Sequence, residues 1–150
     1  MGDSAGGGLS LGFAIYLKEL SLPQPKEIVL FSPWVDIATD NPEISLYEPF
    51  DPFLKQSGIQ EVAKFLAGEE LKQPLVSPLF GDLSGLGRIS IYIGTHDIFY
   101  PDNRLLHEKL LKEGIAHRYI EREKMNHVYI GFPIKEARED IQELIEELKK

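Results

Sequence analysis

The stretch that decides the fold is MGDSAGGGLS, residues 1–10. Residues 2–6 match the pattern Gly-x-Ser-x-Gly, which is typical of a sharp turn between a strand and a helix. The residues flanking the serine are small, as a sterically crowded turn requires, and such a turn presents the hydroxyl of Ser4 to a substrate. Ser4 is therefore a candidate nucleophile, and the N–H of Ala5 is a candidate donor to an oxyanion.

The residues after this turn predict a helix over 5–20, because apolar side chains recur there at helical spacing. Glycine stands at positions 6, 7, 8 and 12 of this helix, where each glycine costs about 1 kcal/mol relative to alanine. Close packing of the helix against a sheet explains these glycines, and it is the explanation we favour. The alternative is a helix start that faces an anion.

Three apolar runs predict strands near 27–31 (EIVLF), 88–93 (RISIYI) and 116–121 (AHRYIE). A helix is expected between the second and third runs, with Asp102 as its cap and Gly114 at its end. A strand, a helix and a strand with short joints imply a parallel, right-handed crossover. The fold class is therefore α/β, with about three parallel strands and flanking helices. Residues 134–150 predict a last, amphipathic helix.

Residues 40–78 differ from the rest of the chain because they hold several prolines and no clean period, apart from a short predicted helix over 59–68. So long an irregular segment is uncommon in a compact domain unless it is a lid or a binding loop. We therefore expect an insert that forms a cap or part of a pocket. Four apolar residues could line that pocket, although ordinary core packing explains them equally well: Phe50, Phe53, Leu54 and Phe65.

The whole chain has 150 residues, a formal net charge of −8 and no cysteine. The length suits one domain. The acidic balance argues against non-specific binding to nucleic acid or to an anionic membrane. The lack of cysteine excludes a disulfide framework, a cysteine nucleophile and thiolate metal sites. No signal peptide and no apolar run of membrane-spanning length is present, so we expect a cytoplasmic location.

A serine nucleophile needs a base, and the chain offers four histidines. His107 falls within a helix and His117 within the third predicted strand, where a packed or solvated histidine is usual. His96 and His127 both follow predicted strands, at the edge where sites of α/β proteins form. Asp97 can orient His127, whereas His96 would need an acid from elsewhere. We therefore favour His127 as the base, in the order Ser4, Asp97, His127.

Five blocks of the sequence together resemble the C-terminal half of an α/β-hydrolase of the hormone-sensitive-lipase family. They are GDSAGGGL, IVLFSPWVDI, LVSPLFGDLSGL, IYIGTHDIFYPD and MNHVYIGF. The resemblance implies a serine carboxylesterase or lipase-like hydrolase of short-chain esters. Ser4 would be its nucleophile, Asp97 its acid, His127 its base and Ala5 an oxyanion donor. It implies no cofactor and no metal, and Asp102 matches a second acidic position of the family.

The resemblance also implies that residues 1–150 are a single, incomplete domain, because the family's Gly-rich oxyanion loop and several strands have no counterpart here. We therefore expect little activity from the isolated chain, and homo-oligomers formed through an exposed sheet edge or apolar faces. One alternative is a non-catalytic remnant that acts as an interaction module. A serine peptidase of the same fold is disfavoured, because the blocks around SPWVDI and SPLFGDLSGL resemble esterases.

Overall fold

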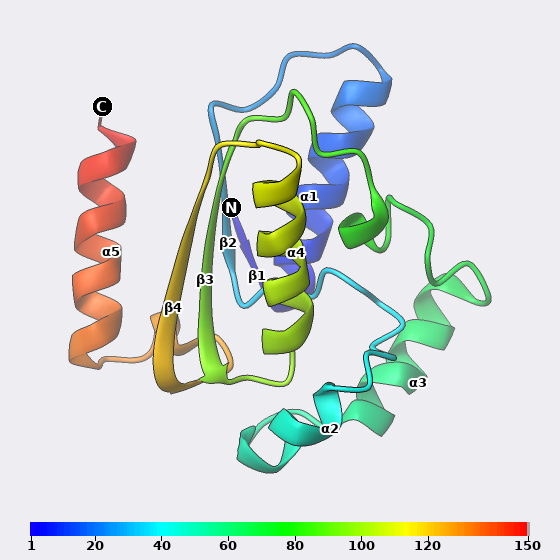
Figure 1. Cartoon of the computed structure of the whole chain (residues 1–150), viewed down its shortest axis with the longest axis vertical. Coiled ribbons are helices and arrows are strands. Elements are labelled where there is room, and N and C mark those ends of the chain that lie inside the picture. The colour runs from blue at the N-terminus through cyan, green and yellow to red at the C-terminus, as the bar shows by residue number, and fades with distance from the viewer. Residues whose placement is uncertain (150) are drawn as a thin grey trace.

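The computed structural model describes residues 1–149, and a four-stranded sheet lies at its centre. Every strand runs parallel to its neighbours, and the strands follow one another across the sheet in chain order (Figure 1). The strands are β1 (Gly2–Asp3), β2 (Glu27–Phe31), β3 (Arg88–His96) and β4 (His117–Asn126). All their carboxyl ends therefore lie along the same edge of the sheet.

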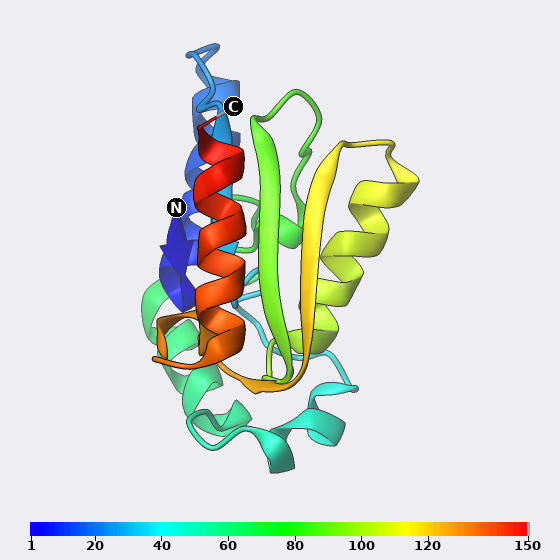
Figure 2. The ribbon, with the colours of Figure 1, turned by 90° about the vertical axis from the view of Figure 1, so that its left-hand side faces the viewer.

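Helices cover both faces of this sheet (Figures 1 and 2). Alternation along β2 explains the two layers, since Ile28 and Leu30 pack into one core cluster and Val29 packs into another. The first cluster includes residues of α1 (Ser4–Glu19) and α4 (Tyr100–Lys112), and the second includes residues of α5 (Lys135–Leu148). Within residues 1–149, no helix is long and apolar enough to cross a membrane.

The three expected strands are confirmed, and the structure adds to them in two places. The two residues before Ser4 form β1, which pairs with the end of β2. The last strand is also longer than expected, because β4 continues to Asn126 after a change of register. Lys124 takes a left-handed conformation there (φ 60°). A side chain at Gly94 would overlap the Met125 carbonyl, so this glycine permits the close approach.

Three of the four glycines of α1, namely Gly7, Gly8 and Gly12, lie where another part of the chain comes close to the helix. A Cβ at Gly7 would lie 2.6 Å from the Cβ of Pro33, and a Cβ at Gly8 would overlap the Trp34 carbonyl. Close packing therefore accounts for these glycines, as expected. The segment that passes over Gly7 and Gly8 is the loop after β2, rather than the sheet itself.

The predicted boundaries of α4 are right at one end and wrong at the other. Gly114 follows the helix with a φ of +66°, as expected of a residue that ends a helix. Asp102, however, is not the cap, because α4 begins two residues earlier, at Tyr100. Asp102 lies in the first turn, where it is 1% exposed and accepts a hydrogen bond from Asn41 at 2.8 Å. The expected terminal helix ends at Leu148, and residue 150 of that prediction lies outside the described residues.

The insert is more regular than the sequence suggested, and it extends across the carboxyl edge of the sheet (Figure 1). Several polar side chains join it to the rest of the fold. Asn41 contacts α4 through Asp102, Asp51 accepts the N–H of Ile98, and Lys72 pairs with Asp36 at 2.7 Å. Its elements are α2 (Ile44–Tyr47), the 3₁₀ helix η1 (Glu48–Phe50), α3 (Gln56–Ala67) and the 3₁₀ helix η2 (Pro78–Phe80).

Candidate active site

The register of the sheet determines which residues meet at its carboxyl edge. Asp3 pairs with Phe31, so Ser4 and Ser32 leave the sheet side by side. The last pair between β3 and β4 joins His96 to Asn126, so the next residue on each strand, Asp97 and His127, also leaves at the same level. Ser4, Asp97 and His127 therefore all follow strands that end at one edge.

Asp97 and His127 are in direct contact. The Nδ1 of His127 lies 3.0 Å from Oδ2 of Asp97, and Asp97 is fully buried. An ionised carboxylate only accepts hydrogen bonds, so Nδ1 is the donor and Nε2 is left free to take a proton. The other oxygen of Asp97 accepts the N–H of Phe99 at 2.9 Å, and the ring of Phe99 meets the His127 ring edge-on at 5.3 Å. The pair is thus shielded and oriented.

The loop that carries His127 is also tied to the strand two places away in the sheet. The hydroxyl of Ser32 accepts the N–H of Val128 at 2.9 Å. Ser32 is 1% exposed and has a φ of 46°, and Val128 has a φ of 51°. Left-handed conformations are strained for residues other than glycine and persist where the surroundings enforce them. This bond brings the His127 loop back across β3 towards β1.

Ser4 stands on the tight turn that its sequence predicts. β1 ends at Asp3, α1 begins at Ser4, and Ser4 has a φ of 49°. Its carbonyl accepts the N–H of Trp34 at 2.9 Å, and its side chain is half-buried. Within the described residues 1–149, no hydrogen bond joins the Ser4 hydroxyl to His127. Asp3, the residue before Ser4, lines the same hollow as His127.

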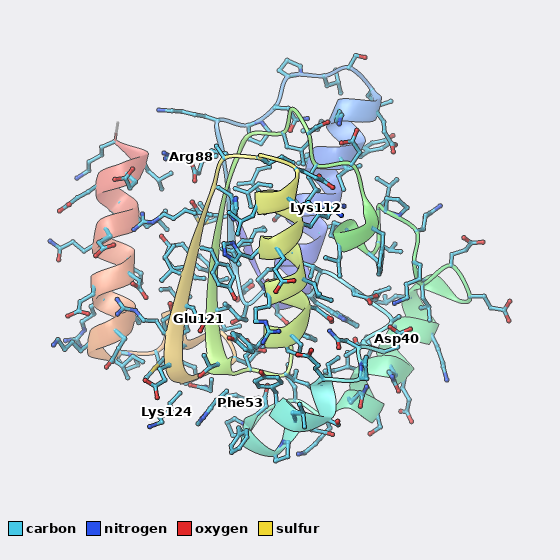
Figure 3. All side chains as sticks on the ribbon, in the orientation of Figure 1. Asp40, Phe53, Arg88, Lys112, Glu121 and Lys124 are labelled. Atoms are coloured by element: carbon cyan, nitrogen blue, oxygen red, sulfur yellow. The ribbon has the colours of Figure 1, made fainter. Side chains whose placement is uncertain are left out.

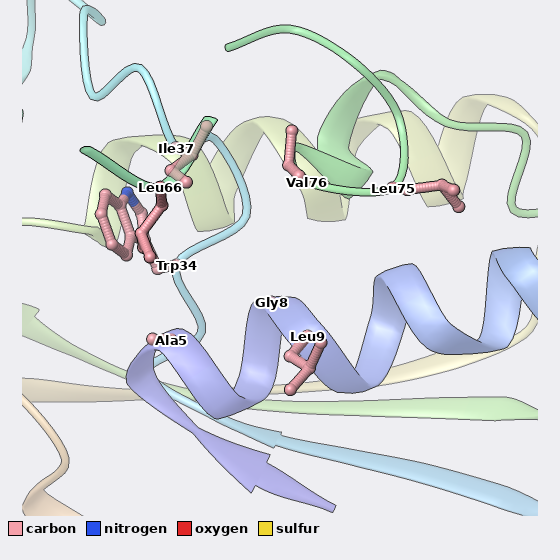
Figure 4. A pocket seen from close by; sticks show the side chains of 8 residues that line it. All are labelled: Ala5, Gly8, Leu9, Trp34, Ile37, Leu66, Leu75 and Val76. Carbon is pink, nitrogen blue, oxygen red and sulfur yellow. The ribbon is translucent and has the colours of Figure 1, made fainter. Parts of the chain in front are cut away.

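Two hollows adjoin this edge. One is lined by Asp3, His127 and two aromatic side chains, Phe53 and Phe132, and Figure 3 shows Phe53 beneath the ends of β3 and β4. The other is an apolar pocket of about 310 Å³ between α1 and the loops above it (Figure 4). Its lining residues are Ala5, Gly8, Leu9, Trp34, Ile37, Leu66, Leu75 and Val76. A flexible apolar group bound beside Ala5 would lie in this pocket.

The other three histidines have partners other than the Asp97 carboxylate. His96 stacks on Phe50 with ring centroids 4.9 Å apart. His107 on α4 and His117 on β4 contact each other, with 2.7 Å between Nδ1 and Nε2. Sequence reasoning placed these two residues separately and missed the pair, because their proximity follows only from packing of α4 on β4. Within residues 1–149, no group of three or more His, Asp or Glu side chains could hold a metal ion.

Asp102 is a buried acidic residue whose pKa is raised by its surroundings. Burial raises its pKa to about 6, and the hydrogen bond from Asn41 opposes this only in part. Its second oxygen is buried without a partner. Asp102 contacts neither Asp97 nor His127, so the structure gives it a role in joining the insert to α4.

Comparisons with known proteins identify the family of the chain. Residues 1–131 match the family described as having the alpha/beta hydrolase fold. An acetyl-hydrolase of Streptomyces hygroscopicus is 33% identical over 129 residues, which cover 85% of this chain and 43% of that protein.

Two crystal structures are similar over nearly the whole chain. An esterase from the bacterial hormone-sensitive lipase family has a TM-score of 0.91 at 29% identity, covering 98% of this chain and 50% of its own. An esterase/lipase from an uncultured bacterium has a TM-score of 0.90 at 30% identity, covering 99% and 50%. The chain thus spans about half the length of these relatives. It belongs to the α/β-hydrolase family, and its relatives include esterases of the hormone-sensitive-lipase group.

Proposed function

We propose that this chain carries the catalytic triad of a serine carboxylic ester hydrolase, with Ser4 as nucleophile, His127 as base and Asp97 as acid. The observation that carries the proposal is the buried hydrogen bond between Asp97 and His127, at the sheet edge where the strained turn of Ser4 also lies. The same three residue types, with the same division of roles, recur in serine hydrolases of unrelated folds.

The chemistry follows from the free nitrogen of His127. Nε2 takes the proton of the Ser4 hydroxyl as Oγ attacks the ester carbonyl carbon, and Asp97 stabilises the imidazolium that results. The proton then passes to the leaving alcohol as the carbon–oxygen bond breaks. A water molecule, deprotonated by Nε2, then attacks the acyl-serine. The bond between the acyl carbon and Oγ breaks, the acid is released, and Nε2 returns the proton to Oγ of Ser4. The N–H of Ala5, in the first turn of α1, is unpaired within its helix and can donate to the oxyanion.

We assign short-chain carboxylic esters as the substrates. The pocket beside Ala5 is apolar and about 310 Å³ in volume, which suits a small acyl group. The name of the Streptomyces relative, an acetyl-hydrolase, supports the same class. We assign residues 40–78 as a cap that forms part of the substrate site, since Phe53 lines the hollow at His127.

The nucleophile can be tested by covalent labelling, which does not require efficient turnover. A fluorophosphonate should attach to Ser4, as located by mass spectrometry, and the label should disappear in Ser4→Ala and weaken strongly in His127→Ala. Ser10→Ala is the matched control, because Ser10 is on the same helix and donates only to the Gly6 carbonyl.

Hydrolysis of nitrophenyl acetate and nitrophenyl butyrate by the same variants completes the test. Any turnover should depend on Ser4, with a loss of at least about a thousandfold in Ser4→Ala where turnover is measurable. Labelling and hydrolysis that persist in Ser4→Ala would contradict the assignment. A chain that takes no label at Ser4 would favour the alternative of a non-catalytic interaction module.

A further inference from the structure

Asp51 is a buried carboxylate of the insert, with 3% of its surface exposed. Its Oδ1 accepts the N–H groups of Phe53 and Leu54 at 2.8 and 3.0 Å, and its Oδ2 accepts the N–H of Ile98 at 2.9 Å. A buried carboxylate persists only when its oxygens are well hydrogen-bonded. One oxygen therefore shapes the turn of the insert, and the other fixes a distant segment.

That distant segment is the turn of the candidate acid. The N–H of Ile98 belongs to the peptide unit that follows Asp97, and Ile98 is itself fully buried. The Asp97 side chain leaves the chain from the same unit, with one oxygen on the N–H of Phe99 and the other on His127. A bond that fixes this peptide unit therefore also fixes the direction of the Asp97 carboxylate.

Aromatic contacts reinforce the connection on both sides of Asp51. Phe50 stacks on His96, the residue before Asp97, with 4.9 Å between ring centroids. Phe53 stacks on Phe132 at 5.9 Å, and both line the hollow at His127. Three residues of the insert, Phe50, Asp51 and Phe53, thus contact the segments around Asp97 and His127.

We propose that Asp51 is a positioning residue: its carboxylate orients the Asp97 turn towards His127 and couples the substrate-lining insert to the acid of the triad. The catalytic meaning of this coupling rests on the proposed function. The orientation of the His127 ring by Asp51, through Asp97, can be measured without catalysis.

Asp51→Asn tests the proposal, because the amide keeps one oxygen and replaces the other by an NH₂ group. That group either faces the N–H of Ile98 or, after a flip, the N–H groups of Phe53 and Leu54, so half of the connection is lost in both cases. The readout is the tautomer of the neutral His127 ring, from ¹⁵N NMR at about pH 9, where an imidazole is uncharged.

The wild-type ring should carry its proton on Nδ1, since Asp97 accepts there. In Asp97→Ala the proton of the neutral ring should move to Nε2. This variant therefore gives the largest change in tautomer ratio that loss of the Asp97 contact can cause. Asp51→Asn should lower the ratio of the Nδ1–H to the Nε2–H form by about threefold to tenfold, the factor expected for a weakened hydrogen bond. Where turnover is measurable, kcat should fall by a similar factor with KM less affected.

Asp36→Asn is the matched control. Asp36 is also 3% exposed and also accepts a local backbone N–H, from Ala38 at 3.0 Å, but it contacts neither Asp97 nor His127. The tautomer ratio should therefore match the wild type in Asp36→Asn even if the protein is destabilised. An unchanged ratio in Asp51→Asn, or a wild-type ring without the Nδ1 proton, would overturn the proposal. Failure of the proposed function is a separate result, namely the absence of labelling at Ser4.

Discussion

Single residues in left-handed conformations define the edge of the sheet where Ser4, Ser32 and Val128 lie. Their φ values of 49°, 46° and 51° each carry a cost of about 1–3 kcal/mol, which the surrounding contacts must offset. Ser4 stands on the turn that bears the candidate nucleophile, and Ser32 and Val128 share a hydrogen bond. Three of the six residues other than glycine that have a positive φ within residues 1–149 therefore lie at this edge.

Ser32→Gly removes the hydroxyl of Ser32 but permits the same backbone conformation, because glycine adopts a φ of 46° without strain. Loss of the bond to the Val128 N–H should lower the free energy of unfolding by about 1–2 kcal/mol, less any gain from relief of strain. It should also loosen the loop of His127. Urea denaturation and amide exchange at Val128 measure the two effects.

Ser21→Gly is the control, since Ser21 also has a positive φ (55°) but is exposed and forms no side-chain hydrogen bond within the described residues. Equal protection of the Val128 amide in wild type and Ser32→Gly would contradict the role given to the hydroxyl.

Asp102 gives a prediction for pH. Its pKa is raised to about 6 in the folded chain from an ordinary value of 3.8, so between these pH values the folded chain holds a proton that the unfolded chain has released. Stability from this group is therefore present below about pH 4 and is lost as pH rises through about 6, by at most about 3 kcal/mol.

The comparison with Asp102→Asn isolates this effect, since asparagine does not titrate and can still accept from Asn41. The difference in free energy of unfolding between wild type and Asp102→Asn should shift against the wild type between pH 4 and pH 7.5. A difference that is constant with pH would show that the carboxyl stays ionised in the folded chain.

At the scale of elements, the packing of α4 on β4 includes the contact between His107 and His117. Burial first, and the neighbouring His117 second, lower the pKa of His107 below its usual value. The ring of His107 also stacks on Tyr119 at 4.2 Å. Because the folded chain binds this proton less readily than the unfolded chain, the stability from His107 is present at neutral pH and is lost as pH falls.

His107→Gln should remove this sensitivity. The wild type should lose more stability than the variant on going from about pH 7.5 to about pH 5, as measured by urea denaturation at each value. His96→Gln is the comparison variant, because His96 also stacks on an aromatic ring but has no histidine partner. Parallel pH profiles for wild type and His107→Gln would exclude a contribution from the pair.

Much of the element structure could be predicted from the sequence because it depends on local patterns. The sequences of β2 and β3 are largely apolar runs, and the pattern of residues 2–6 predicts the turn before α1. The start of α4 was misplaced because Asp102 looked like a cap, although Pro101 in the first turn was a signal for an earlier start. Asp97 and His127 could be paired from chain order and the family resemblance.

The connections between distant segments could not be predicted in this way. Asp51 and Ile98 are 47 residues apart in the sequence, and Ser32 and Val128 are 96 residues apart. Contacts between such distant residues produce no periodic pattern in the sequence. The insert looked irregular because its order depends on these contacts rather than on helix or strand propensity. The residues that support the site are thus less visible in sequence than the residues that form it.

At the scale of the whole molecule, the outer face of α1 leaves several large apolar side chains exposed. Leu9, Phe13, Tyr16 and Leu20 recur at helical spacing and are between 44% and 71% exposed. Exposed apolar surface of this kind favours association, as does the unpaired edge of β1. Self-association therefore remains a prediction for this chain.

Phe13→Glu tests it at the centre of this face. Sizing by analytical ultracentrifugation should give dimers or larger species for the wild type and a smaller average mass for the variant. Leu111→Glu is the control, because Leu111 is 60% exposed on a different helix. A wild-type chain that is monomeric at micromolar concentration would contradict the prediction.

The change of register between β3 and β4 has a consequence for insertions and deletions. From Gly94 to His96 the chain of β3 advances two residues, while β4 advances four, from Arg122 to Asn126. Both steps are even, so the alternation of side chains between the two faces is the same before and after it. The two surplus residues supply roughly 7 Å of chain, which the turn at Lys124 takes up.

Replacing Lys124 by glycine should thus be tolerated, whereas deleting Lys124 should invert the alternation of side chains and direct His127 away from Asp97. Amide and ring NMR signals of His127 in the two variants would measure the difference. Parity, rather than the identity of residues 123–125, is what this part of the sequence must preserve.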